Sequence, residues 1–190
     1  QITKLGLPGD VIVSEKHHGG PDLAVYIYGD ADYDWWRNEL NRELAPGIFG
    51  ENLTISGLES ASFAIGDILY IGEVTLQVTA PRIPCKTFSA RMEDPQLVKK
   101  FRAAERPGLY CRVLKEGKVQ AGDSVHVEKY DEESVSLLDC YRDHYTPDLQ
   151  TSVIQRFLDA PIAIRMREEK EKQLKKVLGN NNDRKKRDHP

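Results

Sequence analysis

Short apolar segments, separated by glycine or proline every few residues, fill the chain from residue 1 to about 130. Their β-branched and aromatic residues are typical of strands. Short strands at this spacing favour a barrel or a sandwich over a parallel α/β sheet, so we expect a mainly β, barrel-like core. The segments are DLAVYIY (22–28), DILYIG (67–72), EVTLQVTA (73–80), GLYCRVL (108–114) and SVHVEKY (124–130).

Two helices are expected to interrupt the strands. The stretch 30–44 has an acidic start and apolar residues at helical spacing, and the stretch 94–105 begins with Asp-Pro, a natural N-cap and first-turn pair. After residue 130 three further stretches show apolar residues three and four apart, with prolines at their joints. We therefore expect a β-rich domain over 1–130, a three-helix appendage over 131–178 and a flexible basic tail over 179–190.

Composition narrows the protein class. The chain has 190 residues, 39% of them hydrophobic, and a formal net charge of -3. This near-neutral balance does not indicate a nucleic-acid binder. No apolar run approaches the roughly 20 residues of a membrane-spanning helix, and we see no signal peptide. Three widely spaced cysteines argue against a disulfide framework and favour a reducing cytoplasm.

Cys85 is the cysteine with the most suggestive surroundings, the stretch APRIPCKTF over 80–88. Nearby Arg82 and Lys86 create a positive field, which stabilises the thiolate, the form that attacks electrophiles or binds soft metals. The alternative is a small buried hydrophobic residue, the usual fate of a free cysteine. Cys111 and Cys140 fit that alternative better, and we assign both to packing.

Two glycine-containing motifs could bind ligands. KHHGGPD (16–22) could form a nest of backbone N–H groups that binds an anion such as phosphate, and it could equally be an ordinary turn. PGIFGENLTISGL (46–58) offers Glu51 and Asn52, whose amide suits the edge of a heterocycle or merely closes a turn. One thiolate and one anion nest suit a metal that is already chelated by an organic dithiolene.

The ordered set KHHGGPD, AVY, GIFGENLT, IGD and QVTAPRIPC resembles the MOSC family, and within it the YiiM-like branch, over nearly the whole chain. The resemblance implies a MOSC-type barrel with a three-helix C-terminal appendage, and an N-terminal family segment that we expect to be missing here. It also implies a bound molybdenum cofactor (molybdopterin), with Cys85 as the protein ligand to molybdenum. At the position where the family often has a basic residue this chain has Leu23. The implied cofactor-binding residues are His18, Gly19, Gly20, Asn52, Arg82 and Lys86.

The implied activity is reduction of N-hydroxylated small molecules, such as hydroxylaminopurines and amidoximes, to amines. Electrons would come from an external donor protein, because the sequence carries no flavin, haem or iron–sulfur motif. The helical appendage could dock that donor, form a homodimer, or cover the core. Two alternatives stay open: a non-catalytic carrier of the cofactor or of sulfur, and a small-ligand β-barrel module in which Cys85 holds no metal.

Overall fold

The computed structural model describes residues 1–9, 20–130 and 133–187. The side chains of Lys86 and of residues 180–187 lie outside this description, as does the His18–Gly19 part of the glycine-pair motif.

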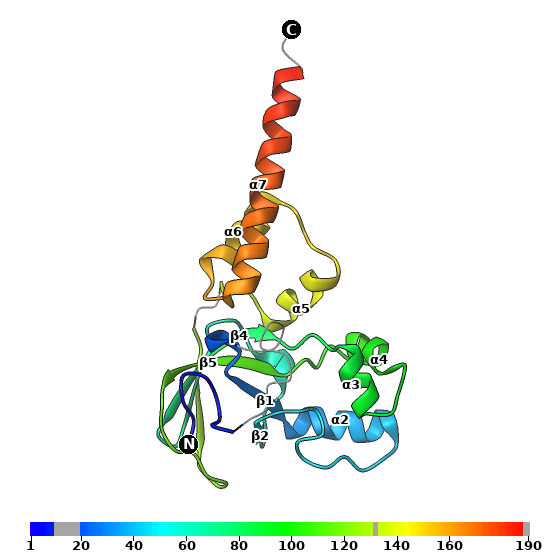
Figure 1. The fold of residues 1–190 in the computed structure, drawn as a ribbon, viewed down its shortest axis with the longest axis vertical. Helices are drawn as coiled ribbons and strands as arrows, with labels where there is room; N and C mark the ends of the chain where they lie inside the picture. The colour runs from blue at the N-terminus through cyan, green and yellow to red at the C-terminus, as the bar shows by residue number, and fades with distance from the viewer. Residues whose placement is uncertain (10–19, 131–132, 188–190) are drawn as a thin grey trace.

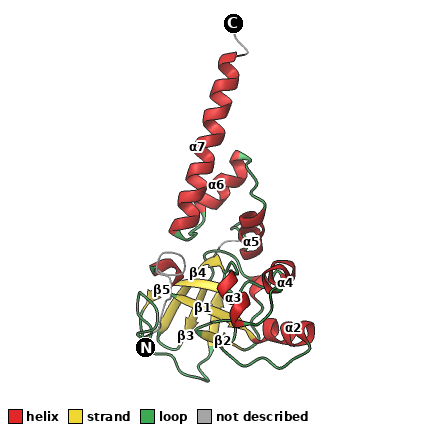
Figure 2. Ribbon diagram, turned by 45° about the vertical axis from the view of Figure 1, so that its right-hand side comes forward, coloured by secondary structure: helices red, strands yellow, loops and turns green. Residues whose placement is uncertain are grey.

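The core is one curled, half-barrel sheet of six strands in the order β2-β1-β5-β4-β3-β6 (Figures 1 and 2). Only β1 and β2 pair in parallel; the other four pairings are antiparallel. The five strands expected from the sequence are confirmed, and the three-residue β2 between two glycine turns is an addition. The strands are β1 (Val25–Gly29), β2 (Leu53–Ile55), β3 (Ile68–Ile71), β4 (Val74–Pro81), β5 (Leu109–Lys115) and β6 (Val125–Glu128).

The C-terminal half of β4 is buried on both faces of the sheet, unlike a strand with one exposed face. Its residues alternate between buried and half-buried positions at first, but residues 78–81 are all buried. The register with β5 shifts between Val78 and Ala80, and such an irregularity bends a strand and increases its twist. This end of β4 is covered by α5 (Leu137–Tyr145), which packs against it.

The helices inside the β-rich part match the expected regions but not every boundary. The helix α2 (Asp30–Leu40) ends at Asn41, which takes the left-handed conformation with φ of 48°. The helix α4 (Leu97–Ala104) begins three residues after Asp94, because Asp94 and Pro95 form a preceding turn in which Asp94 accepts a hydrogen bond from the Gln96 N–H. Three short elements were not expected, η1 (Pro21–Leu23), η2 (Ser60–Ser62) and α3 (Lys86–Arg91).

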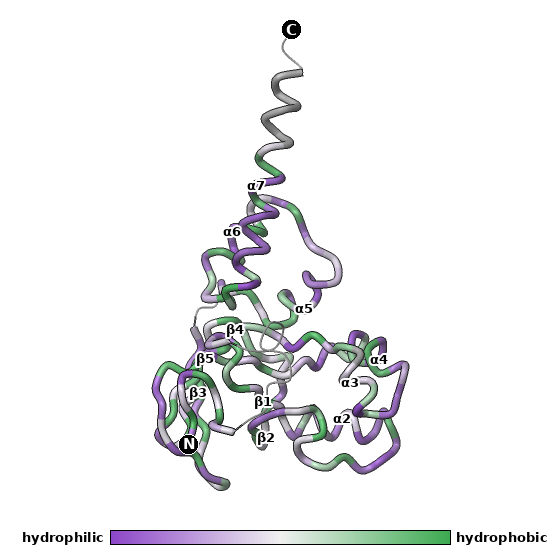
Figure 3. The backbone as a smooth tube through the Cα atoms, in the orientation of Figure 1, coloured by the Kyte–Doolittle hydropathy of each residue, from purple (hydrophilic) through white to green (hydrophobic). Residues whose placement is uncertain are grey.

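The C-terminal helices α5, α6 (Thr151–Asp159) and α7 (Ile164–Arg187) lie where the sequence indicates helices. Ser136 caps α5 by accepting a hydrogen bond from the Asp139 N–H, as its position before the apolar run predicts. The backbone of α7 continues past residue 178, the expected end of the appendage, since each added residue gains one more helical hydrogen bond. Much of the described part of α7 is hydrophilic (Figure 3).

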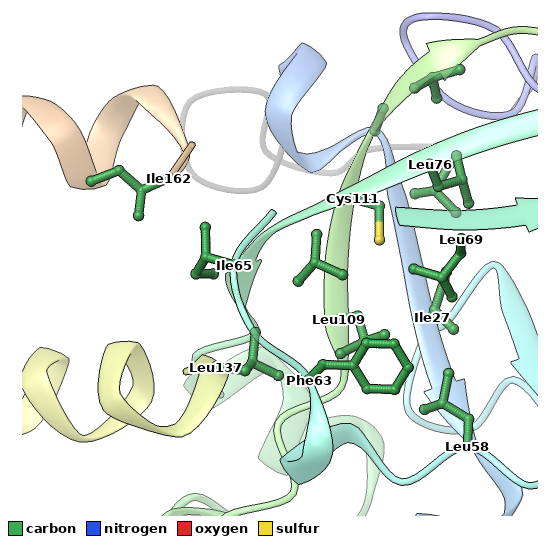
Figure 4. Packing of buried hydrophobic residues seen from close by; sticks show 14 of the residues in the cluster. Ile27, Leu58, Phe63, Ile65, Leu69, Leu76, Leu109, Cys111, Leu137 and Ile162 are labelled. Atoms are coloured by element: carbon green, nitrogen blue, oxygen red, sulfur yellow. The ribbon is translucent and has the colours of Figure 1, made fainter. Parts of the chain in front are cut away.

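The core has two clusters, and the C-terminal segment contributes to both. Leu137 and Ile162 join the larger cluster inside the sheet, where they gather with Ile65 and Phe63 (Figure 4). Tyr141 belongs to a second, aromatic cluster that also contains Trp36 and Phe49. The helical segment therefore covers the sheet and shares its apolar interior.

Candidate functional site

Cys85 lies four residues after the end of β4 and is the N-cap residue of α3. Its backbone is extended, with φ of -126° and ψ of 173°, and its carbonyl oxygen accepts the hydrogen bonds that start the helix. Its thiol makes no capping hydrogen bond within the described chain. Cys85 is half-buried and packs against the aromatic cluster.

The other two cysteines are structural, as expected. Cys111 is 0% exposed and Cys140 is 1% exposed. Burial raises the pKa of both thiols well above the ordinary value, so both stay protonated. Of the three free thiols, Cys85 is the one that is not fully buried.

Arg82 is a cation whose electrostatic surroundings include this thiol. Its guanidinium lies over the rings of Tyr26, at 4.9 Å, and Phe88, at 4.7 Å, and donates a hydrogen bond to the Phe49 carbonyl oxygen. No carboxylate among the described residues pairs with it. A half-buried guanidinium without a counter-charge favours an anion in its neighbourhood.

Arg82, Cys85 and Tyr110 lie close enough for their charges to influence one another. Burial acts to lower the pKa of Arg82, but the nearby Tyr26, Tyr110 and Cys85 outweigh it and raise the pKa above its ordinary value. Burial is the main cause that raises the pKa of Tyr110, while Arg82 lowers it and Cys85 raises it. Tyr110 therefore keeps its phenolic proton at neutral pH.

The loop 46–52 also lies next to the Arg82 guanidinium. A Cβ atom placed on Gly50, whose φ is 79°, would lie 3.3 Å from an Arg82 terminal nitrogen. Oε1 of Glu51 accepts hydrogen bonds from Gly47 N–H at 2.8 Å, from the Tyr33 hydroxyl and from Thr54. Its second oxygen, Oε2, is buried and has no hydrogen-bond partner among the described residues.

Asn52 ties this loop to β1. Its Oδ1 accepts a hydrogen bond from the Tyr26 N–H at 2.8 Å, and its own N–H donates to the Tyr26 carbonyl oxygen at 2.8 Å. These contacts reach a strand 26 positions away in the chain, and a role of Asn52 in binding a ligand stays a prediction. Asn52 places the loop beside the strand that carries Tyr26.

The described end of the glycine-pair motif lies at the same end of the sheet. Gly20 has φ of 110°, and the η1 turn that follows packs on β4 and β5. Thr79 of β4 donates a hydrogen bond to the Asp22 carbonyl oxygen at 2.5 Å, and Arg112 of β5 pairs with the Asp22 carboxylate at 3.0 Å. His18 and Gly19 lie outside the described residues, so their place relative to Cys85 stays a prediction.

A cavity of about 500 Å³ joins these two loops. Leu23 of the glycine-pair turn lines it together with Pro81 and Ile83 of the Cys85 loop and Tyr110 of β5. Most of the remaining lining comes from α5 and α7. The end of the sheet, Leu23, Ile83 and the helical segment thus meet around one space, and Cys85 itself is not among its lining residues.

Sequence reasoning missed two residues at this site. Tyr110 pairs with Ala80 across the β4–β5 ladder, and only this register brings it beside Cys85. Arg91 is the last residue of α3 and donates a hydrogen bond to the Gly47 carbonyl oxygen at 2.9 Å. A helix assigned directly after Cys85 would have indicated Arg91, but six residues carry too weak a periodic signal.

Within the described ranges, no group of three or more histidine, cysteine, aspartate or glutamate side chains could hold a metal ion. None of the helices in those ranges is both long and apolar enough to cross a membrane.

Three curated relatives are similar to this chain. The protein YflK of Bacillus subtilis (strain 168) is 34% identical over 79% of this chain and 68% of its own length. YiiM of Escherichia coli (strain K12) is 35% identical over 63% of this chain and 55% of its own length. A protein named "Reductase" from Gibberella moniliformis (strain M3125 / FGSC 7600) is 36% identical over 63% of this chain, but that region is only 22% of the relative.

Comparison of the fold with solved structures also finds YiiM. The crystal structure of Escherichia coli YiiM superposes with a TM-score of 0.77 at 25% identity, covering 93% of this chain and 85% of that one. The family model of the MOSC domain matches residues 14–126, a region that contains the glycine-pair motif, the loop 46–52 and Cys85. The chain therefore belongs to the MOSC domain family.

Proposed function

We propose that this protein binds molybdenum cofactor through Cys85 and reduces N-hydroxylated small molecules to amines. The observation that carries the proposal is the pairing of a half-buried, uncapped thiol with a half-buried arginine that has no carboxylate partner among the described residues. A MOSC domain, relatives named YiiM and "Reductase", and the YiiM-like fold support it.

The residues present fit such a cofactor. Soft sulfur at Cys85 suits molybdenum, and Arg82 provides the positive charge that an anionic, dithiolene-bearing pterin needs. The orphaned Oε2 of Glu51 is an acceptor for a pterin N–H. Asn52 would act by holding the loop 46–52 in place. Lys86, His18, Gly19 and Gly20 complete the proposed anion site.

When bound, the cofactor supplies the redox chemistry: a hydroxylamine nitrogen takes up two electrons and two protons and yields the amine and water. The electrons come from an external donor protein in this proposal. The chain itself contributes position and field. Arg82 is held by two aromatic faces and one carbonyl oxygen, so its charge stays directed at the site, and Tyr110 keeps a proton on its phenolic oxygen beside Cys85.

The test is the Cys85→Ser variant, expressed in a host that makes the cofactor. Serine is a hard, mostly protonated ligand, so we expect loss of bound molybdenum and of benzamidoxime reduction with an artificial reductant. The far-UV circular dichroism spectrum and the melting temperature should be unchanged, because the half-buried sulfur makes no capping contact.

Cys111→Ala is the matched control: it removes a thiol from the core and should keep molybdenum and turnover. A Cys85→Ser protein that retains both metal and turnover would refute the proposal. Wild-type protein that holds molybdenum stoichiometrically but reduces no N-hydroxylated compound would instead assign it as a carrier.

A further inference from the structure

The wall of the cavity that belongs to the helical segment is organised by a buried ion pair. Nζ of Lys170 lies 2.6 Å from the Asp143 carboxylate, and the Lys170 side chain is 2% exposed. The same ammonium group lies 4.3 Å from the centre of the Phe157 ring. These contacts join α5, α6 and α7 at one point and hold the polar wall of the cavity in place.

The charges around the cavity balance. Arg165 and Lys170 are basic, and Asp143 and Glu169 are acidic. His144 adds no charge near neutral pH, because desolvation lowers its pKa below the ordinary value and outweighs the opposite effect of Asp143. A balanced wall does not select an anion, in contrast to the surroundings of Arg82, and it suits a neutral ligand.

One acceptor in this wall is left unused. The Gln173 amide nitrogen donates to a Glu169 carboxylate oxygen at 3.4 Å, which orients the amide. Its Oε1 is buried and has no hydrogen-bond partner among the described residues. A buried acceptor without a donor is costly, so this oxygen favours a ligand that carries an N–H group.

The rest of the lining is largely apolar. It includes Leu23, Pro81, Ile83 and Tyr110 from the β-rich part of the chain and Met166 of α7. A volume of about 500 Å³ is within the range of small-molecule sites, and an apolar cavity with a few convergent polar groups is their usual form. An aromatic ring system fits such a space by stacking on the apolar side and donating hydrogen bonds on the other.

We infer that this cavity binds the body of the substrate, a neutral, flat heteroaromatic group with an N–H donor directed at Gln173 Oε1. The inference rests on the proposed function for the identity of the reacting N–OH group, which would extend past Ile83 and Tyr110 toward Cys85. The helical segment then determines which N-hydroxylated compounds are accepted. Gln173 and Met166 are its specificity-determining residues.

The experiment uses two probes. The first is adenine, a neutral flat amine of the product class, whose Kd for the protein without cofactor is measured by titration calorimetry. The second is the ratio of kcat/KM for 6-hydroxylaminopurine to that for hydroxylamine, which has no ring to place. The variants are Met166→Trp, which fills the cavity, and Gln173→Ala, which removes the acceptor.

The matched control is Lys172→Trp, the same bulky addition at an exposed position of α7 outside the cavity lining. We expect Met166→Trp to weaken adenine binding and to lower the kcat/KM ratio, each at least tenfold. Gln173→Ala should change the same two quantities about fivefold to tenfold. Hydroxylamine turnover of these variants, and all values for Lys172→Trp, should stay within twofold of wild type. Circular dichroism verifies that each variant is folded.

The outcomes separate the two proposals. The cavity assignment is overturned if the wild type does not bind adenine. It is also overturned if Met166→Trp and Gln173→Ala bind adenine as tightly as the wild type does. Adenine binding that is lost in both variants, in a protein that reduces none of the substrates, supports the cavity assignment and removes the proposed function.

Discussion

The ion pair of Lys170 and Asp143 gives the sharpest stability prediction. The two side chains are 2% and 14% exposed, and their charged atoms are 2.6 Å apart. Replacing Lys170 by methionine keeps an unbranched apolar chain against Phe157 but leaves the Asp143 carboxylate without its cation. Removing one partner of a buried pair typically costs about 3–5 kcal/mol.

The partial exposure of Asp143 sets the expected value at the lower end of this range. Water can reach part of the unpaired Asp143 carboxylate, so we expect Lys170→Met to lower the free energy of unfolding by about 3 kcal/mol. The second variant, Lys170→Met with Asp143→Asn, has no buried charge left and should recover at least half of that loss, because a neutral amide is far cheaper to bury than a carboxylate.

Urea unfolding near neutral pH, followed by far-UV circular dichroism, measures these differences, with an unchanged m-value as the sign that only the native state is affected. Lys172→Met is the control, since Lys172 is exposed on the same helix and should change stability by less than about 0.5 kcal/mol. The reasoning fails if Lys170→Met costs no more than this control, or if the double variant is less stable than the single one.

Two further predictions concern the sheet and the join between helices. Gly29→Ala should lower stability by about 3 kcal/mol in thermal unfolding, because its Cβ would lie 1.8 Å from the Leu58 carbonyl oxygen, whereas Gly179→Ala meets nothing within 4 Å and should cost nothing. An equal loss of stability in the Gly29→Ala and Gly179→Ala variants would contradict the predicted clash. Arg142→Gln should cost less than about 1 kcal/mol at neutral pH, since the pair with Glu105 is largely exposed. A hydrogen bond from Arg142 lowers the pKa of Glu105, so this contribution is present above the ordinary pKa of 4.5 and disappears as the pH falls through the depressed value; a difference that persists in strong acid would refute the assignment.

The strands and helices were predictable because their signals are local. Alternating apolar residues in 67–72, 73–80 and 124–130 indicate strands without reference to the rest of the chain, and β3, β4 and β6 form there. The same holds for the helix after Ser136, whose cap and apolar spacing lie within one stretch. Two short elements were missed: β2 has only three residues and so shows no alternation, and the six residues of α3 complete fewer than two helical turns.

The proposal that Cys85 is a site residue could be made from sequence, since its flanking prolines and basic residues are adjacent in the chain. Tyr110 could not be added to it, because it lies 25 positions further on and only the β4–β5 register, with its shift after Val78, places it opposite Ala80 at the end of β4. In the structure, Asn52 also binds β1 by accepting a hydrogen bond from the Tyr26 N–H. No local pattern in the sequence indicates this contact.

The sequence by itself determined the class of the fold, the order of its elements and the thiol around which a site can form, because these depend on residues that are close along the chain. The tertiary structure alone decided that the helical segment closes over the end of β4 and encloses a cavity with it. Its physical reason is packing: Leu137, Cys140 and Ile162 complete an apolar core that the sheet cannot bury alone, and that docking brings Lys170, Asp143 and Gln173 to face the Cys85 loop.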